Sequence, residues 1–371
     1  MSEQVEAAQV RELARQFAES ELRPHVEHWD RERELPAGTL DALAELGFYG
    51  MLVPEEFGGM GFDLPSYLGA LEELAWGEPA VALLLSIHNA FGTLLVDVGS
   101  DAQKTKWLEA MAAGRERVCF ALSEEHAGSD AGSLETRAMR DGDGWRIVGR
   151  KKWVTHGSRA TLALVAARTG DAGARGISLF AVPVGPDAAG VDVVEREATM
   201  GLRAADVVTL ELDVRVDGDA LIGEQGKGFA YAMRGLDRGR LGIAAQAIGI
   251  AQAALEHARG YAAERKQFDT ALRDFEAIQF KLADMATRTA AARALLLDAA
   301  REPSTERSAM AKLFASETAM WVTTQAVQIF GGYGYMRDYP VEKLMRDAKA
   351  TEIYEGTNEI QRVVIARALY T

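Results

Sequence analysis

The hydrophobic periodicity of the chain changes twice along its length, and this order restricts the possible folds more than any single motif. Up to about residue 115, apolar residues recur at helical spacing, as in Val10, Leu13, Ala14 and Phe17. Around Val118 the pattern changes to short segments rich in Val, Ile, Thr and Leu, and the last third of the chain returns to long, alanine-rich helical segments. The sequence therefore predicts an α+β multidomain fold with an all-α N-terminal domain, a central β-barrel or β-sandwich domain and a C-terminal four-helix bundle, over residues 1–116, 117–222 and 223–371.

Proline, glycine and aspartate mark the ends of the expected elements. Pro24 breaks the first helical run, and Pro36 and Pro65 each stand at the start of a further helix. The run Asp141–Gly144 predicts a hairpin turn, because Asp-Gly accepts the positive φ that such turns require. The other expected strands lie at 145–148, 162–166, 177–182 and 207–212, and the long expected helices lie at 233–263, 275–297 and 308–329.

Composition and charge exclude several classes of protein. The chain of 371 residues has a net charge of −14, whereas a nucleic-acid partner requires a basic face. It contains no run of eighteen apolar residues, and its first residues lack a basic start and an apolar secretory core. We therefore expect a cytoplasmic protein without a membrane segment. The single cysteine, Cys119, is expected to pack in the core, and no HExxH pair or cysteine cluster suggests a metal site.

Two short motifs imitate sites for other chemistry. The glycine-rich run Gly223–Gly228 lacks both the first glycine and the final Ser or Thr of a phosphate-binding loop, and no βαβ unit surrounds it. It predicts a turn into a helix. Ser129 lacks the glycine two residues before it that a nucleophile elbow requires, so a hydrolase is not supported.

Near the C-terminus, the run Ile353–Gln361 places an acidic residue between an aromatic residue and a glycine. Ile360, Val363 and Val364 then begin a helical spacing, so Glu355 is expected at a helix entrance. For Glu355 by itself, two interpretations are open. It is either a solvated glutamate favoured by the helix dipole, which is the commoner case, or a general base pointing into an apolar pocket.

Four other stretches have features of a cofactor site, but these features also have simpler structural explanations. Phe120–Glu124 leads into Ala127–Asp130, and Lys152–Thr155 offers an indole face and a hydroxyl on one side of a strand, which is also ordinary β packing. Arg265–Phe268 ends a helix with a cation and an aromatic residue, as either a solvated helix end or a phosphate clamp. Gln328–Tyr335 ends another helix in a glycine turn, which is either a helix stop or a close approach to a dinucleotide.

Together, and in this order along the chain, these stretches resemble the acyl-CoA dehydrogenase family. The resemblance runs over nearly the whole chain and includes Gly201–Arg203, Leu236–Arg240 and Arg346–Ala348. Leu236–Gly249 and Gln279–Met285 are most similar to the short-chain, butyryl-like branch. Several motifs in one order are far more specific than any one of them.

The resemblance implies that the protein binds FAD and oxidises an acyl-CoA thioester to the trans-2-enoyl-CoA, a step of fatty acid β-oxidation. By similarity, the β domain would hold the isoalloxazine ring, and a neighbouring subunit would reach the diphosphate and adenosine end. A homo-oligomer, expected to be a homotetramer, would thus complete the site. The implied flavin contacts are Phe120, Leu122, Ser123, Ser129, Trp153, Val154, Thr155, Thr357, Asn358 and Glu359, with Arg265, Phe268, Gln328, Ile329, Gly331 and Gly332 across the subunit boundary.

By the same resemblance, Glu355 matches the catalytic base, which takes the α-proton while the β-hydride passes to flavin N5. Some relatives carry the base just before the second arginine of the Leu236–Arg240 motif, where this chain has Gly239. With substrate bound, we expect burial to raise the pKa of Glu355 against the helix entrance and Arg240. An electron-transferring flavoprotein is the expected electron acceptor. The implied substrate contacts are Ser129, Asp237, Arg238, Gly239, Arg240 and Gly356.

The chain departs from the family pattern at three places. Glu125-His126 stands where most relatives have Pro-Gly, and Glu276 stands where a glutamine usually contacts FAD. Ser123 replaces a threonine but keeps the hydroxyl. Two other functions remain open: a relative that acts on a carrier-protein thioester or uses oxygen, and a non-catalytic flavin-binding relative.

Overall fold

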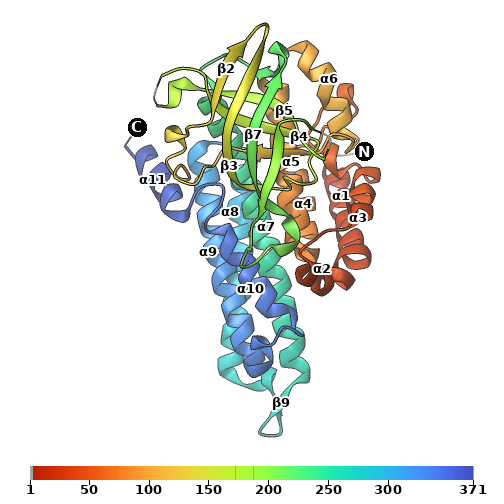
Figure 1. The fold of residues 1–371 in the computed structure, drawn as a ribbon. Coiled ribbons are helices and arrows are strands. Elements are labelled where there is room, and N and C mark those ends of the chain that lie inside the picture. The colour runs from red at the N-terminus through yellow and green to blue at the C-terminus, as the bar shows by residue number, and fades with distance from the viewer. Residues whose placement is uncertain (1–2, 172, 187, 371) are drawn as a thin grey trace.

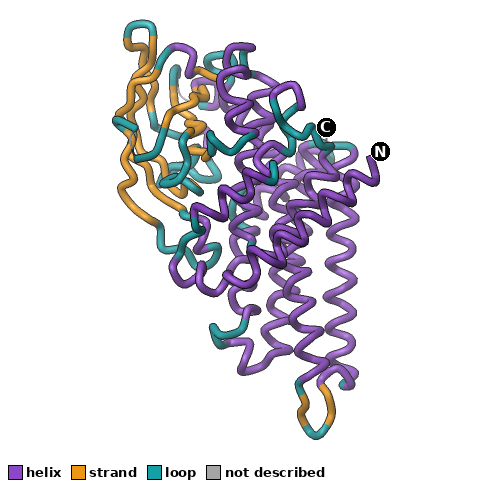
Figure 2. Tube along the Cα trace, turned by 90° about the vertical axis from the view of Figure 1, so that its right-hand side faces the viewer, coloured by secondary structure: helices purple, strands orange, loops and turns teal. Residues whose placement is uncertain are grey.

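Two helical parts flank a central sheet in the computed structural model, which describes residues 3–171, 173–186 and 188–370 (Figure 1). Seen from the side, the sheet covers only one end of the helical bundle, and the other end extends away from it (Figure 2). The predicted order of a helical, a β and a second helical part is confirmed. The sheet therefore lies close to the helices at one end of the bundle and leaves the other end uncovered (Figure 2).

The N-terminal helices begin and end at residues whose chemistry explains the boundaries. The Asp63 carboxylate accepts the backbone N–H of Ser66 at 2.9 Å, and Ser100 and Gln103 form a capping box. Leu13 was expected on the buried stripe, but it is 37% exposed, because that stripe is narrower than the spacing suggested. The helices are α1 Glu3–Phe17, α2 Val26–Glu32, α3 Ala37–Glu45, α4 Leu64–Gly77, α5 Pro79–Val98 and α6 Asp101–Ala112.

Helix α5 is long and apolar enough to cross a membrane by length and composition, with a mean hydropathy of 1.7. However, 72% of that stretch is buried inside the protein, where α4 and α7 pack against it. An interior helix is apolar on all sides for the same reason that a membrane helix is. We therefore assign α5 as a core helix, which brings its residues 87–94 to the end of the bundle that carries the sheet.

The central part is one mixed sheet. Its main path runs β6-β7-β3-β2-β4-β5-β8, with β1 paired to β4, and the end strands β6 and β8 do not pair with each other. The sheet is therefore not a closed barrel. At the predicted hairpin, Asp141 pairs with Gly144 and Gly142 has φ +63°. The strands are β1 Val118–Ala121, β2 Arg137–Asp141, β3 Gly144–Thr155, β4 Leu162–Arg168, β5 Ile177–Pro183, β6 Val191–Arg196, β7 Val207–Val216 and β8 Leu221–Ile222.

The C-terminal part is a bundle of four helices, in which α7 and α9 each pack against the other three, followed by a fifth helix. The bundle helices are α7 Gly228–Glu264, α8 Glu276–Arg301, α9 Thr305–Phe330 and α10 Pro340–Thr351, and α11 Asn358–Ala368 packs on α9. A small hairpin, β9 Lys266–Gln267 with β10 Thr270–Ala271, joins α7 to α8 at the far tip (Figure 1). The predicted four-helix bundle is confirmed.

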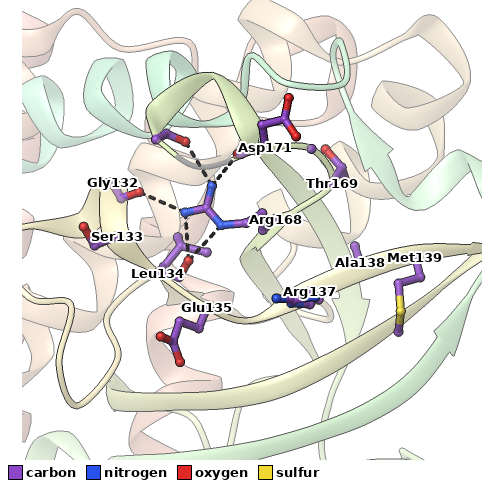
Figure 3. A pocket seen from close by; sticks show the side chains of 12 residues that line it. Gly132, Ser133, Leu134, Glu135, Arg137, Ala138, Met139, Arg168, Thr169 and Asp171 are labelled. Carbon is purple, nitrogen blue, oxygen red and sulfur yellow. Dashed lines mark hydrogen bonds between the residues drawn. The ribbon is translucent and has the colours of Figure 1, made fainter.

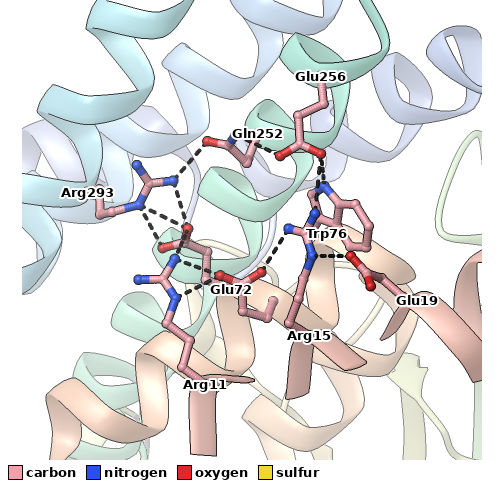
Figure 4. Close-up of polar contacts among 9 residues, drawn as sticks. Arg11, Arg15, Glu19, Glu72, Trp76, Gln252, Glu256 and Arg293 are labelled. Atoms are coloured by element: carbon pink, nitrogen blue, oxygen red, sulfur yellow. Dashed lines mark hydrogen bonds and ion pairs between the residues drawn. The ribbon is translucent and has the colours of Figure 1, made fainter. Parts of the chain in front are cut away.

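A network of ion pairs joins the N-terminal helices to the bundle (Figure 4). Arg11 of α1 and Arg293 of α8 both donate to Glu72 of α4, which is nearly buried. Arg15 bridges Glu73 and Glu256, and its guanidinium lies 3.3 Å from the centre of the Trp76 ring. Because these contacts connect four helices, the N-terminal part and the bundle form one support for the site.

Cys119 is fully buried on β1, and burial raises the pKa of its thiol to about 12. An inert core residue is the expected role for such a thiol. In the part of the chain that the structure describes, no group of three or more His, Cys, Asp or Glu side chains is placed to hold a metal ion.

Candidate active site

Glu355 lies in the loop between α10 and α11, not at the helix entrance itself. The N-cap of α11 is Thr357, whose side chain accepts from Ile360 N. Glu355 has φ +54° and Gly356 has φ +86°, so two successive residues are left-handed. This conformation is unfavourable for a glutamate, and such strain is concentrated at functional sites. The loop therefore aims the Glu355 side chain back toward α7 instead of along the axis of α11.

The Glu355 carboxyl packs directly against Gly239. A Cβ added to Gly239 would lie 2.6 Å from Oε2 of Glu355, so a side chain at this position would force the carboxyl to move. Oε2 is buried and has no hydrogen-bond partner among the described residues. A buried carboxylate oxygen without a partner is costly unless a ligand completes it, so this atom is available for chemistry.

Burial raises the pKa of Glu355 to about 7, against the charges of Arg240 and Lys312, which lower it. At Glu355 the effect of burial on the pKa therefore outweighs the effects of the two cations. Arg240 is almost fully buried and pairs with Asp237, which also accepts the Thr305 hydroxyl at 2.6 Å. A carboxyl with a pKa near 7 can exchange protons at neutral pH, as a general base must.

The Glu355 carboxyl lines a narrow apolar cavity of about 30 Å³. Ile87, Ala90, Phe91 and Leu94 of α5 form one wall. The remaining lining residues are Phe120, Leu164, Ala232, Gly235 and Leu236. An acidic group at the end of an otherwise apolar cavity is suited to a substrate whose reacting part is apolar.

Trp153 provides a flat aromatic surface beside the loop 127–130. The pairing of β3 with β7 shifts register between Lys151 and Val154, and within this bulge Trp153 has φ +58° and is 50% exposed. A Cβ on Gly128 would lie 3.9 Å from the indole ring. The Ser123 and Thr155 hydroxyls are partly exposed, and neither is hydrogen-bonded to another described residue. Two free hydroxyls and an exposed ring suit a planar polar heterocycle.

A buried ion pair that the sequence interpretation missed holds this loop. Lys151 Nζ donates to Glu124 Oε1 at 2.7 Å and to the Leu122 carbonyl at 3.0 Å. The Glu124 carboxylate also accepts the backbone N–H groups of Glu135 and Thr136. Burial lowers the pKa of Lys151 to about 8, although Glu124 raises it. Counting every second residue from the inward-facing Trp145 reaches Lys151, so strand alternation offered a signal.

The Asn358 side chain points into the protein. Its Oδ1 accepts from Lys312 Nζ at 2.9 Å and from Ser316 Oγ at 3.0 Å, and its backbone N–H donates to the Glu352 carbonyl at 2.9 Å, so Asn358 holds the loop from within. Lys312 was missed by the sequence interpretation. It lies on α9 in register with buried Ala315 and Ala319, so the helical spacing marks it as buried.

The remaining predicted contacts are dispersed. Ser129 and Glu359 are exposed, Val154 is buried, and Arg238 pairs with Asp97 at 3.0 Å, away from Glu355. The residues that depart from the family pattern at Glu125-His126 and Glu276 also lie at the surface. Glu125 and Glu276 are exposed, and His126 Nε2 is 3.6 Å from Glu135 Oε1.

A second group of predicted residues lies at the far end of the bundle and does not reach Glu355 (Figures 1 and 2). The Arg265 guanidinium is 5.4 Å from the centre of the Tyr333 ring, and Phe268, at the hairpin tip, is 91% exposed. The other members sit where α9 ends, namely Gln328, Ile329, Gly331 and Gly332. Within one subunit, the predicted cofactor residues therefore form two separate groups.

Residues that follow Ser129 in the sequence line a surface cleft of about 600 Å³ (Figure 3). The Arg168 guanidinium is engaged by backbone carbonyl groups around the cleft, those of Gly132, Leu134, Asp171 and Gly173. Arg137 also lines the cleft and has no ion-pair partner among the described residues. The cleft therefore offers one free cation.

Three family models match the chain in sequence. They are the acyl-CoA dehydrogenase N-terminal domain over residues 4–115, the middle domain over 119–214 and the C-terminal domain over 226–370. The mitochondrial short-chain specific acyl-CoA dehydrogenase of Bos taurus is 44% identical over 366 residues, covering 96% of this chain and 88% of the relative.

Solved structures agree with this assignment. Butyryl-CoA dehydrogenase from Megasphaera elsdenii superposes with a TM-score of 0.96 at 40% identity, covering 98% of both chains. The prolyl acyl carrier protein oxidase AnaB superposes with a TM-score of 0.93 at 31% identity, covering 99% of both chains. The chain therefore belongs to the acyl-CoA dehydrogenase family. It is an oxidoreductase that is similar to the short-chain, butyryl-like branch of this family.

Proposed function

We propose that the protein binds FAD and converts a short acyl-CoA to its trans-2-enoyl-CoA, with Glu355 as the base that takes the α-proton. One observation carries this proposal: the Glu355 carboxyl faces an apolar cavity with a buried oxygen that no described residue satisfies. The similarity to a short-chain specific acyl-CoA dehydrogenase and to butyryl-CoA dehydrogenase supports a short acyl chain.

The residues around Trp153 fit a flavin. The exposed indole face and the free Ser123 and Thr155 hydroxyls would hold the ring, with the backbone of Phe120 and Leu122 beside them. When bound, FAD supplies the acceptor for the β-hydride. The Lys151–Glu124 pair keeps the loop in place to receive the ring.

The chain's own groups account for the proton transfer. The α-proton of a thioester is weakly acidic, so its removal requires a carboxylate at contact distance and stabilisation of the developing enolate oxygen. The backbone N–H of Glu355 donates to no acceptor among the described residues, so it is free to hold that oxygen. Substrate that fills the cavity excludes water from the carboxyl, and this raises the pKa of Glu355 further.

We place the CoA part outside this cavity. Ser129 begins the path toward the surface cleft, and Arg137 offers a cation to a phosphate there. Asp237 and Arg240 lie on the same turn of α7 as Gly239, next to the thioester position.

An anaerobic titration with butyryl-CoA tests the proposal. In the wild-type holoenzyme the flavin absorbance should bleach, and in Glu355→Gln the bleaching should be slower by about 10²- to 10⁴-fold, because a general base is lost. Glu317→Gln removes an exposed carboxylate from α9 and should bleach like the wild type. Wild-type bleaching in Glu355→Gln would show that another group is the base.

A second candidate is an enzyme that acts on a carrier-protein thioester or reacts with oxygen. The similarity to the prolyl acyl carrier protein oxidase over 99% of both chains supports this second candidate. Comparing bleaching by butyryl-CoA with bleaching by the butyryl carrier protein, followed by reoxidation in air, separates the two. The non-catalytic alternative predicts no bleaching by either thioester.

We further propose a homotetramer in which the far end of the bundle meets the FAD of a neighbouring subunit, with an electron-transferring flavoprotein as acceptor. Phe268 and Tyr335 are 91% and 85% exposed there. Aromatic side chains as exposed as these suggest a contact with another chain. We also propose that the three domains divide after residues 116 and 222. Light scattering combined with the flavin content of Phe268→Ser would test the subunit contact.

A further inference from the structure

Lys312 is a buried lysine beneath the loop that carries Glu355. Its side chain is fully covered, and its Nζ donates to the Gly356 carbonyl and to Asn358 Oδ1, both at 2.9 Å. Both acceptors are neutral. A buried ammonium usually contacts a carboxylate directly, so this arrangement leaves its charge incompletely balanced.

Charged groups face Lys312 from three directions. Glu355 and Glu352 face it from the loop after α10, Glu359 from α11 and Arg240 from α7. Burial lowers the pKa of Lys312, while the three carboxylates raise it and Arg240 lowers it. Among these groups, Glu355 has the largest effect on Lys312.

Glu355 in turn faces two cations. Arg240 has Asp237 as its ion-pair partner, whereas Lys312 has no carboxylate within salt-bridge distance among the described residues. The field of Lys312 at Glu355 is thus not cancelled by a directly bound counterion. Tyr354, the neighbour of Glu355, directs its phenol to Gln246 and away from this pair.

We propose that Lys312 is a positioning residue for Glu355: its ammonium holds the loop at Gly356 and Asn358, and its charge favours the ionised form of the Glu355 carboxylate. This inference rests on the proposed function, because it takes Glu355 as the base. The hydrogen bonds fix the two left-handed residues of the loop, and the charge opposes the effect of burial. The two contributions can be separated by substitution.

The experiment measures the second-order rate constant for flavin bleaching by butyryl-CoA against pH in holoenzymes. In Lys312→Met the midpoint of the rising limb should move up by about 1 pH unit, since an opposite charge near the base is removed. Lys312→Gln should show the same shift. It keeps a donor for the Gly356 carbonyl and should recover part of the limiting rate at high pH.

Ser316→Ala is the matched control. It removes a hydrogen bond to the same Asn358 Oδ1 but no charge, so the midpoint should stay in place. A readout independent of turnover is the infrared carboxyl band that disappears in Glu355→Gln. This band should titrate at higher pH in Lys312→Met, and Lys312→Gln supplies both measurements if Lys312→Met does not fold.

Midpoints that stay at the wild-type pH in the Lys312 variants, with normal flavin absorbance, would overturn this inference. Failure of the proposed function has a different signature, because Glu355→Gln would then still bleach. Loss of bleaching in Glu355→Gln together with unshifted Lys312 variants would reject only the role of Lys312.

Discussion

Lys343 and Lys312 are both buried lysines of the helical bundle, and they differ in how the charge is surrounded. Lys343 Nζ lies 2.9 Å from a Glu78 oxygen and 2.7 Å from an Asp347 oxygen. Burial opposes its charge, but Asp347 and Glu78 outweigh burial and raise its pKa. Lys312 has only neutral acceptors at hydrogen-bond distance, and burial lowers its pKa.

The comparison separates a structural cluster from a reactive one. Around Lys343 the ammonium lies within ion-pair distance of both buried carboxylates, and Asp347 also accepts Leu202 N at 2.6 Å, which ties the sheet part to α10. Around Glu355 one carboxylate oxygen has no partner. A buried carboxylate with a cation in direct contact is held in place, whereas one without a direct counterion can exchange a proton or accept a ligand.

The largest expected effect is on stability, at the Lys343 cluster. Lys343→Met leaves the buried Glu78 and Asp347 carboxylates unpaired, so the free energy of unfolding should fall by about 3–5 kcal/mol. Urea unfolding of the holoenzyme measures this loss. Lys281→Met, which removes a lysine bonded to the Gln325 amide, is the control and should change little. Equal losses in the two variants would show that the Lys343 cluster is not structural.

The next effect is an increase in the free energy of unfolding, and it depends on pH. The pKa of Glu355 is about 7 in the folded protein and 4.5 ordinarily, so the folded state binds the extra proton between these values. Stability from this group is therefore present at low pH and lost as pH rises through 7. Glu355→Gln should be more stable than the wild type by up to about 3 kcal/mol at pH 8 and equal to it at pH 4.5. A difference in stability that does not vary with pH would contradict the burial of this charge.

A smaller effect is expected where α7 touches the base. Gly239→Ala places a methyl group where Glu355 Oε2 now lies, so the carboxyl must move. We expect the bleaching rate to fall by about 10- to 100-fold, because small misplacements of catalytic groups are costly. Gly260→Ala on the same helix meets no atom within 4 Å and should bleach normally. If both variants bleach alike, the close packing at Gly239 has no functional consequence.

Periodicity and turn residues were sufficient to predict the architecture. The helical, β and helical parts, the hairpin at Asp141–Gly144 and the bundle were all predictable, because they depend on local patterns. Strand β6 was not predicted, since five of its six residues are exposed and leave no alternation to detect. The bulge at Trp153 arises from pairing with β7, which no local pattern encodes.

The site was predicted less completely. Glu355 and Gly239 came from motifs, but the contact between them joins segments more than a hundred residues apart. The buried partners Lys151, Lys312 and Lys343 were missed, because a lysine in isolation indicates a solvated face. Whether its charge can be buried depends on acceptors supplied by distant elements.

The central claim is that Glu355 is a base whose pKa has been raised to act near neutral pH. The most direct measurement is the second-order rate constant for flavin bleaching by butyryl-CoA in the wild-type enzyme from pH 5.5 to 9. At low substrate this constant reports the free enzyme. It should rise with pH to a plateau, with a midpoint near pH 7. A constant that is independent of pH over this range, or that falls as pH rises, would contradict the account.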